Sequence, residues 1–332
     1  MFSASVATAA IIGAGVLTGP IADTSHSSGM PQKATATAAS RVHCSSHDRR
    51  LAKKLTGDIA NALATRASVS SLSFYDRPTK TKCTFKPSRK YDSASVVKTV
   101  ILGALLYEKG GSLSESEATL AHKMITESDN SSATTLWKQL SDLKDPKKPN
   151  PVKIKKFLNK AGMRDTVPSD DGNWGLTQVT AGDQSKLLRI FSGVDSSVLD
   201  GNARSYALRL MSQVQANQRW GATAGAPLDS LIHVKNGWLQ RSQGADVEPF
   251  DRGDWKVNSM AAITGSGHNS GLVVLTENNR VPEGRPAGEG WNHGIDSIET
   301  ISRAIYRDIY PGTEGYHPGR PFGPTDLSST AR

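Results

Sequence analysis

The sequence of 332 residues contains few of the residue types that build metal sites. It has eight histidines and two cysteines, and it contains neither an HExxH nor a CxxC pattern. Zinc and related metals need closely spaced ligands of these types. We therefore expect a site without metal and without any other cofactor.

The sequence also lacks a basic surface of the kind that binds nucleic acid. Its formal net charge is +9, from 40 Lys and Arg against 31 Asp and Glu. The basic residues are dispersed, with only short runs such as Lys147-Lys148, and aromatic residues are not interleaved with them to stack bases. We expect no nucleic-acid partner. The charge indicates a solvated surface, with a loose attraction to anionic polymers as the alternative.

No apolar run is long enough to span a membrane. The longest one, residues 4–17, is rich in small residues and has the length of a signal-peptide core. Residues 1–22 are therefore predicted to be a signal peptide, cleaved after Ala22 or near Ala38. No Lys or Arg precedes the run, so the alternative is a disordered tail without an export role. We expect a secreted or cell-envelope protein with no integral membrane segment after signal removal.

The two cysteines follow a stretch that resembles a linker. Residues 23–43 are rich in Ser, Thr, Ala and Gly and are predicted to connect the signal peptide to the folded domain. In an oxidising compartment an isolated pair of cysteines most simply forms one disulfide. A bond between Cys44 and Cys83 would tie the segment before the first helix to an early strand.

Apolar periodicity outlines an α/β protein. Leu51, Leu55, Ile59 and Leu63 recur every four residues and predict a helix over 48–66. Residues 96–106 are apolar nearly all the way round and predict a buried helix that ends before Gly110-Gly111. Further helices are predicted near 115–126, 131–142, 152–161, 182–192, 199–215 and 295–309. Strands are predicted over 69–75, 82–86, 231–234, 256–264 and 271–276, with a loop over 167–180.

This order of elements indicates a single sheet that both ends of the chain complete. Residues 312–332 contain much Pro and Gly with little apolar content, and we expect a disordered tail there. The sequence has no internal repeat. Nothing in it points specifically to self-association, so a monomer is the default expectation.

The first chemical motif is a serine and a lysine one helical turn apart. Ser95-Val96-Val97-Lys98 places the side chains of Ser95 and Lys98 on the same face of the predicted buried helix. A serine hydroxyl needs a neighbour that takes its proton, and a lysine can do so when burial and nearby positive charge lower its pKa. At the start of a helix, the backbone N–H of Ser95 would face an oxyanion. Taken alone, the motif also fits a capping serine with a snorkelling lysine.

Two further motifs follow in order, and together the three resemble a known family. Ser128-Asp129-Asn130 follows a predicted helix, and Lys235-Asn236-Gly237 lies on the first of the late strands. The ordered set SxxK, SDN and K-x-G is similar to the signature of class A β-lactamases and penicillin-binding proteins. The stretches 92–98 and 124–130 resemble the surroundings of the first two motifs in that family. The likeness covers about residues 45–310.

The resemblance implies a fold as well as a chemistry. The expected fold is α/β (α+β) and β-lactamase-like, with an antiparallel sheet built from both chain ends, flanked by helices, plus a helical subdomain. We place the serine hydrolase domain at 44–311 and its helical subdomain at about 95–224. The resemblance also implies that Ser95 attacks the substrate carbonyl, that Lys98 accepts or relays its proton, and that Ser128 passes a proton to the leaving nitrogen.

The resemblance further implies a set of substrate-binding residues. Asn130 would hydrogen-bond the side-chain amide of the substrate. Lys235 would attract its carboxylate and help to hold Ser128. Asn236 and Gly237 belong to the same strand, where Gly237 suits a close backbone approach. The backbone N–H groups of Ser95 and Trp238 would form the oxyanion hole.

Three departures from the family pattern concern deacylation and selectivity. The loop that carries the family's deacylating glutamate corresponds to 164–178, which contains no Glu. Asp170 or Asp171 could hold the hydrolytic water there, or both could be solvated loop acids. Asn236 replaces the usual threonine with a bulkier and differently directed amide. Only 32 residues lie between Ser95 and Ser128, so a wall of the cleft would be missing and larger substrates admitted.

Three functional hypotheses follow. The first is a class A β-lactamase-type hydrolase that opens β-lactams or related cyclic or peptide amides through an acyl-enzyme on Ser95. The second is a D,D-peptidase- or esterase-like relative, acting for example on a cell-wall peptide and slowly acylated by β-lactams. The third is a non-catalytic protein that binds cell-wall material. The intact Ser95, Lys98, Ser128 and Lys235 argue against the third, and the missing loop glutamate favours slow or different turnover.

Overall fold

The computed structural model describes residues 42–145, 148–195, 197–242, 244, 253–279 and 289–319. The predicted signal peptide and all but the last two residues of the predicted linker lie outside this part. Within it, no helix is long and apolar enough to cross a membrane. No group of three or more His, Cys, Asp or Glu side chains in the described ranges could hold a metal ion.

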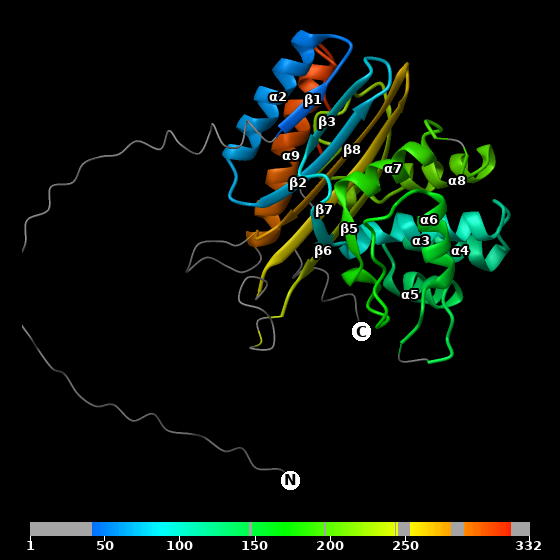
Figure 1. Cartoon of the computed structure of the whole chain (residues 1–332). Helices are drawn as coiled ribbons and strands as arrows, with labels where there is room; N and C mark the ends of the chain where they lie inside the picture. Colours follow the sequence, from blue (N-terminus) through cyan, green and yellow to red (C-terminus); the bar gives the residue numbers. More distant parts are fainter. Residues whose placement is uncertain are drawn as a thin grey trace, which may run out of the picture. The chain divides into compact units, whose positions relative to one another are not determined.

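A six-stranded antiparallel sheet forms the centre of the fold (Figure 1). The strand order is β1-β3-β2-β8-β7-β6, so that early and late strands meet where β2 pairs with β8. The predicted sheet, built from both chain ends, is therefore confirmed. The strands are β1 Val42–Ser45, β2 Val69–Asp76, β3 Thr81–Phe85, β6 Leu231–Gln240, β7 Trp255–Gly265 and β8 His268–Glu277.

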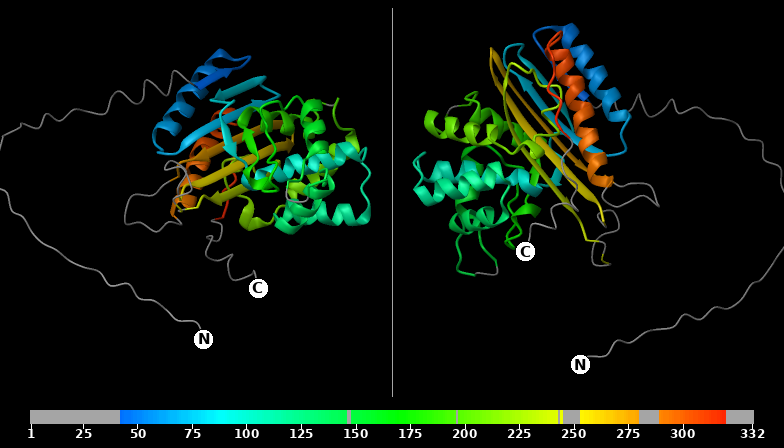
Figure 2. Two further views of the ribbon diagram at one scale, coloured as in Figure 1. Left: turned by 60° about the horizontal axis from the view of Figure 1, so that its bottom comes forward. Right: turned by 180° about the vertical axis from the view of Figure 1, so that it is seen from behind.

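Two long helices cover one face of the sheet. Figure 2 shows α2 (Arg49–Ala64) and α9 (Glu289–Ile309) side by side on this face. Each buries one apolar stripe at helical spacing; in α9 this stripe includes Ile298, Ile301 and Ile305. These helices come from opposite ends of the chain, as the strands of the sheet do.

A helical region lies on the other side of the sheet (Figure 2). Its centre is α3 (Val97–Glu108), of which ten residues from Val97 to Leu106 are buried, as its apolar sequence predicts. Gly103 of α3 lets Phe157 pack closely, because a Cβ there would lie 2.6 Å from the Phe157 ring. The other helices are α4 Glu115–Thr126, α5 Asn130–Gln139, α6 Val152–Lys160, α7 Ala181–Phe191 and α8 Gly201–Ser212, with short 3₁₀ turns η1 Ala94–Val96, η2 Trp174–Leu176 and η3 Ala216–Gln218.

Cys44 and Cys83 form the predicted disulfide between β1 and β3, where they are directly paired. The predicted linker ended at residue 43, but Val42 and His43 already belong to β1. A strand of four residues at the sheet edge is too short to show an alternating pattern, and its pairing with β3 decides its conformation.

Other differences from the predicted elements have similar causes. A second, two-stranded sheet joins β4 (Lys90–Asp92) to β5 (Gln178–Thr180). Strand β6 is longer than predicted, and α9 begins before residue 295. Residues 312–319 differ from the disordered tail expected there: Gly315 bridges Pro227, and Tyr316 exchanges backbone hydrogen bonds with residues 225 and 226. This pairing needs no apolar periodicity, so the composition did not reveal it.

Candidate active site

The nucleophile candidate lies in the tight turn that leads into α3. Ser95 is in η1 and is partly exposed, whereas Lys98, one turn later in α3, is completely buried. The turn is held by Ser93, whose N–H donates to Thr177 O at 2.9 Å and whose hydroxyl donates to Gly175 O at 3.1 Å. Ala94 has a φ of +46°, a left-handed conformation that only strong surrounding contacts maintain in a non-glycine residue.

Strand β6 approaches this turn at Gly237. A Cβ at position 237 would lie 2.5 Å from the backbone nitrogen of Ser95 and 2.6 Å from that of Val96. Only glycine permits this contact, which agrees with the expectation of a close backbone approach at Gly237. The strand therefore forms a wall of the site, and Trp238 is the next residue along it.

Lys98 extends from α3 into a set of hydrogen-bond acceptors. Its Nζ donates to Asn130 Oδ1 at 2.8 Å, to Ser128 Oγ at 3.1 Å and to the backbone oxygen of Ser128. Burial lowers the pKa of Lys98 to about 7, against the opposing charge of Asp129. A lysine with this pKa is partly neutral near pH 7 and can then accept a proton.

Ser128 lies between two buried amines. Lys235 Nζ donates to Ser128 Oγ at 2.9 Å and to Asn236 O at 2.8 Å, and its side chain is fully buried. Burial, with the positive charge of Lys98, holds the pKa of Lys235 well below its ordinary value. When one amine is neutral, its lone pair can accept the proton of the Ser128 hydroxyl. The three groups thus form a continuous path for a proton.

The loop around Ser128 is fixed by local contacts. Ser128 has a φ of +59°, and Asp129 caps α5 by accepting a hydrogen bond from Ser132 N at 2.6 Å. The N–H of Asp129 donates to Lys123 O. These contacts brace the loop, and they aim the side chains of Ser128 and Asn130 at Lys98.

Asn236 is placed differently from the expectation of a substrate contact. Its side chain is fully buried, and its Nδ2 donates to Gln218 O at 2.8 Å and to Trp220 O at 3.0 Å. Neighbouring residues of a strand point to opposite faces, so Asn236 is directed away from the face where Lys235 meets Ser128. Its amide N–H groups therefore hold β6 to the segment that contains Gln218 and Trp220, and no N–H group remains for a substrate.

Comparison with known proteins gives the family. Residues 107–309 match the model of the Beta-lactamase enzyme family, which is more than half of the chain. The chain belongs to the β-lactamase enzyme family. The matched range begins after Ser95 and Lys98, so these two residues are assigned by their motif and by their geometry. A search of curated protein sequences found no match.

Solved structures support the same fold. A β-lactamase from Xanthomonas campestris shares 16% identity and a TM-score of 0.59, with 78% of this chain and 98% of that chain covered. A class A β-lactamase from Bacteroides cellulosilyticus shares 13% identity and a TM-score of 0.60, with 79% and 99% covered. An ancestral class A β-lactamase of Gram-negative bacteria shares 15% identity and a TM-score of 0.56, with 76% and 98% covered. The predicted β-lactamase-like fold is confirmed, and the protein is a serine hydrolase of this type.

The loop that carries a glutamate in β-lactamases presents a tryptophan to Lys98 here. The ring of Trp174 lies with its centroid 4.9 Å from Lys98 Nζ, and its Nε1 donates to Thr134 Oγ1 at 3.1 Å. Sequence reasoning missed this residue. The only signal in the sequence was a bulky aromatic residue in a loop of mostly small and polar residues. This signal does not show that the Trp174 side chain is directed at Lys98.

Neither Asp170 nor Asp171 contacts Lys98 in the part of the chain that the structure describes. Asp170 and Asp171 are both exposed. Asp171 accepts hydrogen bonds from Ser169 and from Asn173, with both Asn173 contacts at 2.9 Å, and these bonds lower its pKa. It acts as the local brace of a turn. The geometry therefore favours the solvated-loop interpretation over water activation for both residues.

Trp238 joins an aromatic cluster beside β6. Its ring centroid lies 5.9 Å from that of Trp220 and 5.9 Å from that of Trp291 on α9. The indole is half-buried in this cluster, which fixes the strand next to Gly237. Any substrate role of Trp238 would thus come from its backbone N–H, as expected from the motif.

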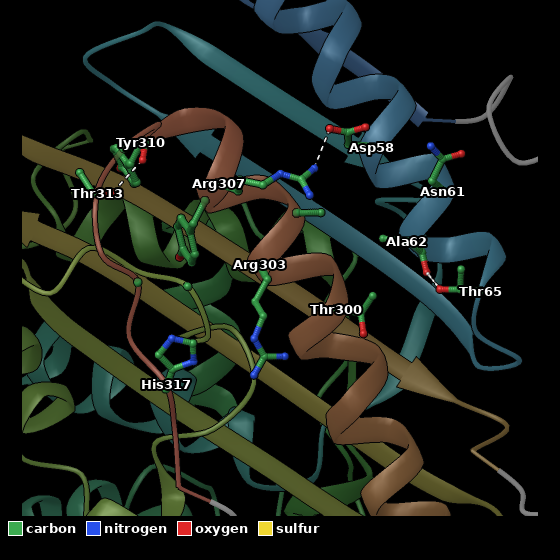
Figure 3. Close-up of a pocket in the computed structure, with 15 residues that line it drawn as sticks. Asp58, Asn61, Ala62, Thr65, Thr300, Arg303, Arg307, Tyr310, Thr313 and His317 are labelled. Atoms are coloured by element: carbon green, nitrogen blue, oxygen red, sulfur yellow. Dashed lines mark hydrogen bonds and ion pairs between the residues drawn. The ribbon is translucent and has the colours of Figure 1, made fainter.

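A large cavity lies elsewhere in the molecule. It has a volume of about 630 Å³ and lies between α2, α9 and the segment that follows α9 (Figure 3). Its charged lining residues are mostly paired: Arg303 with Glu299, and Arg307 with Asp58. None of the motif residues lines it. This cavity is therefore separate from the candidate active site.

Proposed function

We propose that this member of the β-lactamase family forms an acyl-enzyme through Ser95 with β-lactams or related cyclic or peptide amides. The observation that carries the proposal is the Ser128 hydroxyl, which is held between the buried amines of Lys98, one turn after Ser95, and of Lys235 on β6. A binding protein has no need of two desolvated lysines that share one hydroxyl, because each costs folding free energy.

The contacts of Lys98 with Ser128 and of Ser128 with Lys235 support the following acylation step. The Ser95 oxygen attacks the carbonyl carbon while neutral Lys98 takes the hydroxyl proton. Backbone N–H groups of Ser95 and Trp238 would stabilise the negative charge that develops on the carbonyl oxygen. When the C–N bond breaks, Ser128 gives its proton to the leaving nitrogen and regains one from Lys98. The net result is an ester on Ser95 and an amine that carries the serine proton.

Deacylation is the weaker half of the cycle. Water must be deprotonated near the ester, and the indole of Trp174 covers Lys98 on the side of the loop. No carboxylate of the described loop contacts this position, since Asp171 braces its own turn. This observation favours the second candidate function, a D,D-peptidase- or esterase-like hydrolase that β-lactams acylate slowly and whose acyl-enzyme is hydrolysed slowly.

The setting that fits this chemistry is outside the cytoplasm. A disulfide between Cys44 and Cys83 persists in oxidising compartments. We infer a secreted or cell-envelope enzyme that acts as a monomer on a small molecule or a cell-wall peptide. The antibiotic-resistance role of a β-lactamase would require the fast deacylation that Trp174 opposes.

The test combines a chromogenic cephalosporin with intact-protein mass spectrometry. Fast hydrolysis without an adduct supports a β-lactamase; a burst followed by a persistent adduct supports the slowly turning-over hydrolase. Ser95→Ala should abolish both signals, whereas the exposed control Ser116→Ala should leave both unchanged. Neither hydrolysis nor an adduct, with any of several β-lactams, would contradict the enzymatic proposal and favour a cell-wall binding protein.

A further inference from the structure

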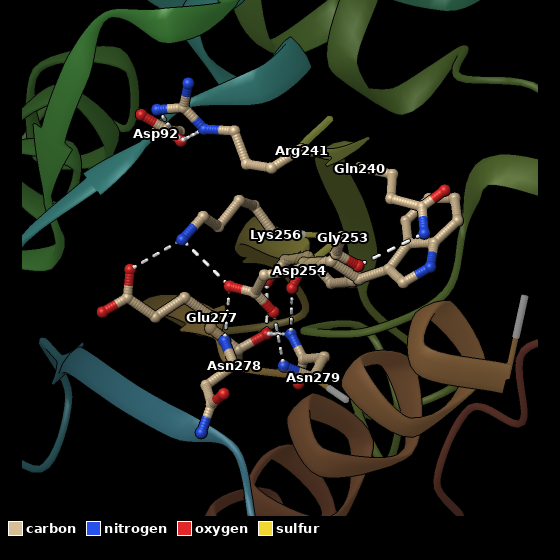
Figure 4. Close-up of polar contacts among 12 residues, drawn as sticks. Asp92, Gln240, Arg241, Gly253, Asp254, Lys256, Glu277, Asn278 and Asn279 are labelled. Carbon is tan, nitrogen blue, oxygen red and sulfur yellow. Dashed lines mark hydrogen bonds and ion pairs between the residues drawn. The ribbon is translucent and has the colours of Figure 1, made fainter. Parts of the chain in front are cut away.

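A buried carboxylate that belongs to none of the three motifs lies three residues before Ser95. Asp92 is the last residue of β4 and is 5% exposed. Its Oδ1 accepts a hydrogen bond from Gln178 Nε2 at 2.6 Å. Its Oδ2 accepts from Arg241 Nε at 2.7 Å and pairs with Arg241 Nη2 at 2.7 Å. Figure 4 shows the Arg241 guanidinium directed at this carboxylate.

These contacts join three segments that are far apart in the sequence. Asp92 leads directly into the turn that carries Ser95. Gln178 ends the loop that carries Trp174, and it is the first residue of β5. Arg241 follows the last residue of β6, three positions after Trp238. One carboxylate therefore connects the nucleophile turn, the loop that covers Lys98 and the strand that would supply half of the oxyanion hole.

The backbone of the same turn is held independently. Asn258 Nδ2 donates to Asp92 O at 2.8 Å and to Ser93 O at 3.1 Å. The left-handed conformation of Ala94 needs such support on both sides. Asn258 is in β7, where it pairs with Gly237 of β6. The sheet therefore fixes the position of the turn relative to β6 and β7. The Asp92 side chain then links this turn to Gln178, at the end of the Trp174 loop, and to Arg241, at the end of β6.

We propose that Asp92 is a positioning residue for acylation, acting through Arg241 on β6 and through Gln178 on the Trp174 loop. The inference rests on the proposed acyl-enzyme function. The backbone donors of an oxyanion hole must meet the developing charge within a fraction of an ångström. A bond between a buried carboxylate and two guanidinium N–H groups is directional enough to hold such a spacing.

The first experiment separates positioning from stability. Asp92→Asn keeps the size of the side chain and removes the charge that Arg241 needs. The matched control is Asp308→Asn in α9: its carboxylate is also buried and is paired with Arg307 and Lys54, away from the site. Both variants should lower Tm. Only Asp92→Asn should lower the limiting acylation rate, by tenfold or more, with the apparent affinity for the cephalosporin within threefold.

A double-mutant cycle tests the route through Arg241. If Asp92 acts through Arg241, the combined variant Asp92→Asn/Arg241→Gln should acylate about as slowly as the slower single variant. Arg241→Lys keeps the positive charge, so it should retain part of the acylation rate that Arg241→Gln loses. A limiting rate of Asp92→Asn within twofold of the parent, with a lowered Tm, would overturn the inference and leave a structural ion pair.

A second readout does not depend on acylation. Amide hydrogen exchange of Asp92→Asn should increase together in peptides that cover 93–98, 174–178 and 236–240, and Asp308→Asn should leave these peptides unchanged. If the parent protein is never acylated, the proposed function fails, and exchange still decides the positioning role. No increase in the three peptides would contradict it.

Discussion

The two sides of the site differ in how closely their polar groups are linked. On the side of α3 and β6, Lys98, Ser128 and Lys235 are linked by hydrogen bonds of 2.9–3.1 Å through a single hydroxyl, and both lysines are buried. On the loop side, the acids are exposed and an indole meets Lys98. Formation of an ester needs only the first side, whereas its hydrolysis also needs a base for water. The difference indicates that attack and release are separable within one fold.

The largest effect is expected from removing the shared base. Lys98→Met has similar length and apolar character but cannot accept a proton, so the acylation rate should fall by about 10²–10⁴-fold. Stopped-flow measurement with a chromogenic cephalosporin gives the rate. Lys123→Met, an exposed lysine of α4, is the control. A Lys98→Met variant that acylates at the parent rate would mean that another group activates Ser95.

Acylation should also depend strongly on pH. Because the pKa of Lys98 is lowered to about 7, the amine is mostly protonated at pH 6 and mostly neutral at pH 8. The rate should therefore rise about tenfold over this range, with an apparent pKa near 7. Lysine in the unfolded chain has a pKa near 10.4, so between the two values the unfolded state binds more protons. The cost of burying Lys98 is therefore complete below pH 7 and is lost as pH rises towards 10.4, so the free energy of unfolding increases over this range.

A profile that stays flat between pH 6 and pH 8 would contradict the assignment of Lys98 as the base. The rate should be read from single-turnover adduct formation, because steady-state turnover would report release instead. Chemical denaturation at pH 7 and pH 9 gives the matching stability measurement, and Lys98→Met should show the smaller change between the two pH values.

The loop side can be altered at Trp174, the residue whose ring meets Lys98. Trp174→Glu would place a carboxylate where the indole contacts Lys98, and loss of the acyl group should accelerate about tenfold or more. Trp174→Phe is the control, because it keeps an aromatic ring and supplies no base. The decay of the adduct is followed by mass spectrometry. Equal decay in the parent and in Trp174→Glu would show that the indole does not limit release.

A smaller effect is expected at the strand position where the family motif has threonine. Both N–H groups of the Asn236 amide donate to Gln218 O and Trp220 O, so a substrate carboxylate finds no free donor in this side chain. Esterifying the carboxylate of a penicillin would then remove only its attraction to Lys235, and we expect the acylation rate to fall only a few-fold. Asn236→Thr should widen the preference for the free acid. A hundredfold preference for the acid in the parent would show that other groups bind it.

The smallest effect on acylation is expected from the disulfide, which lies at the opposite edge of the sheet from β6. Removing it by the pair Cys44→Ala/Cys83→Ala should lower the free energy of unfolding by about 4 kcal/mol for a loop of this length. The acylation rate at a temperature well below Tm should stay within twofold of the parent. A larger loss of rate would show that the two edges of the sheet are coupled.

Sequence alone predicted the local part of this site well. Ser95 and Lys98 lie three residues apart, and the apolar surroundings of Lys98 already indicated a buried helix. Order and spacing also led from these two residues to Ser128, Asn130 and Lys235. Each of these inferences depends on neighbours in the chain or on a motif, which is information that a sequence carries.

What could not be predicted depends on contacts between distant segments. The direction of Trp174 is set by Thr134, and that of Asn236 by Gln218 and Trp220. Strands β1, β4 and β5 have three or four residues and show no periodicity of their own. The contacts of Asp92 likewise depend on Gln178 and Arg241, which are 86 and 149 residues away in the sequence.

The pairing of β2 with β8 has a consequence for how the molecule comes into being. The ribosome synthesises Ser95, Lys98 and Ser128 long before residues 231–277, so the growing chain holds the proposed nucleophile and base before the strands that complete the site exist. Contacts this distant in sequence form late and slowly. Reactivity should therefore appear all at once, when the last strands complete the sheet, and a chain whose last strands have not yet been made should be unreactive.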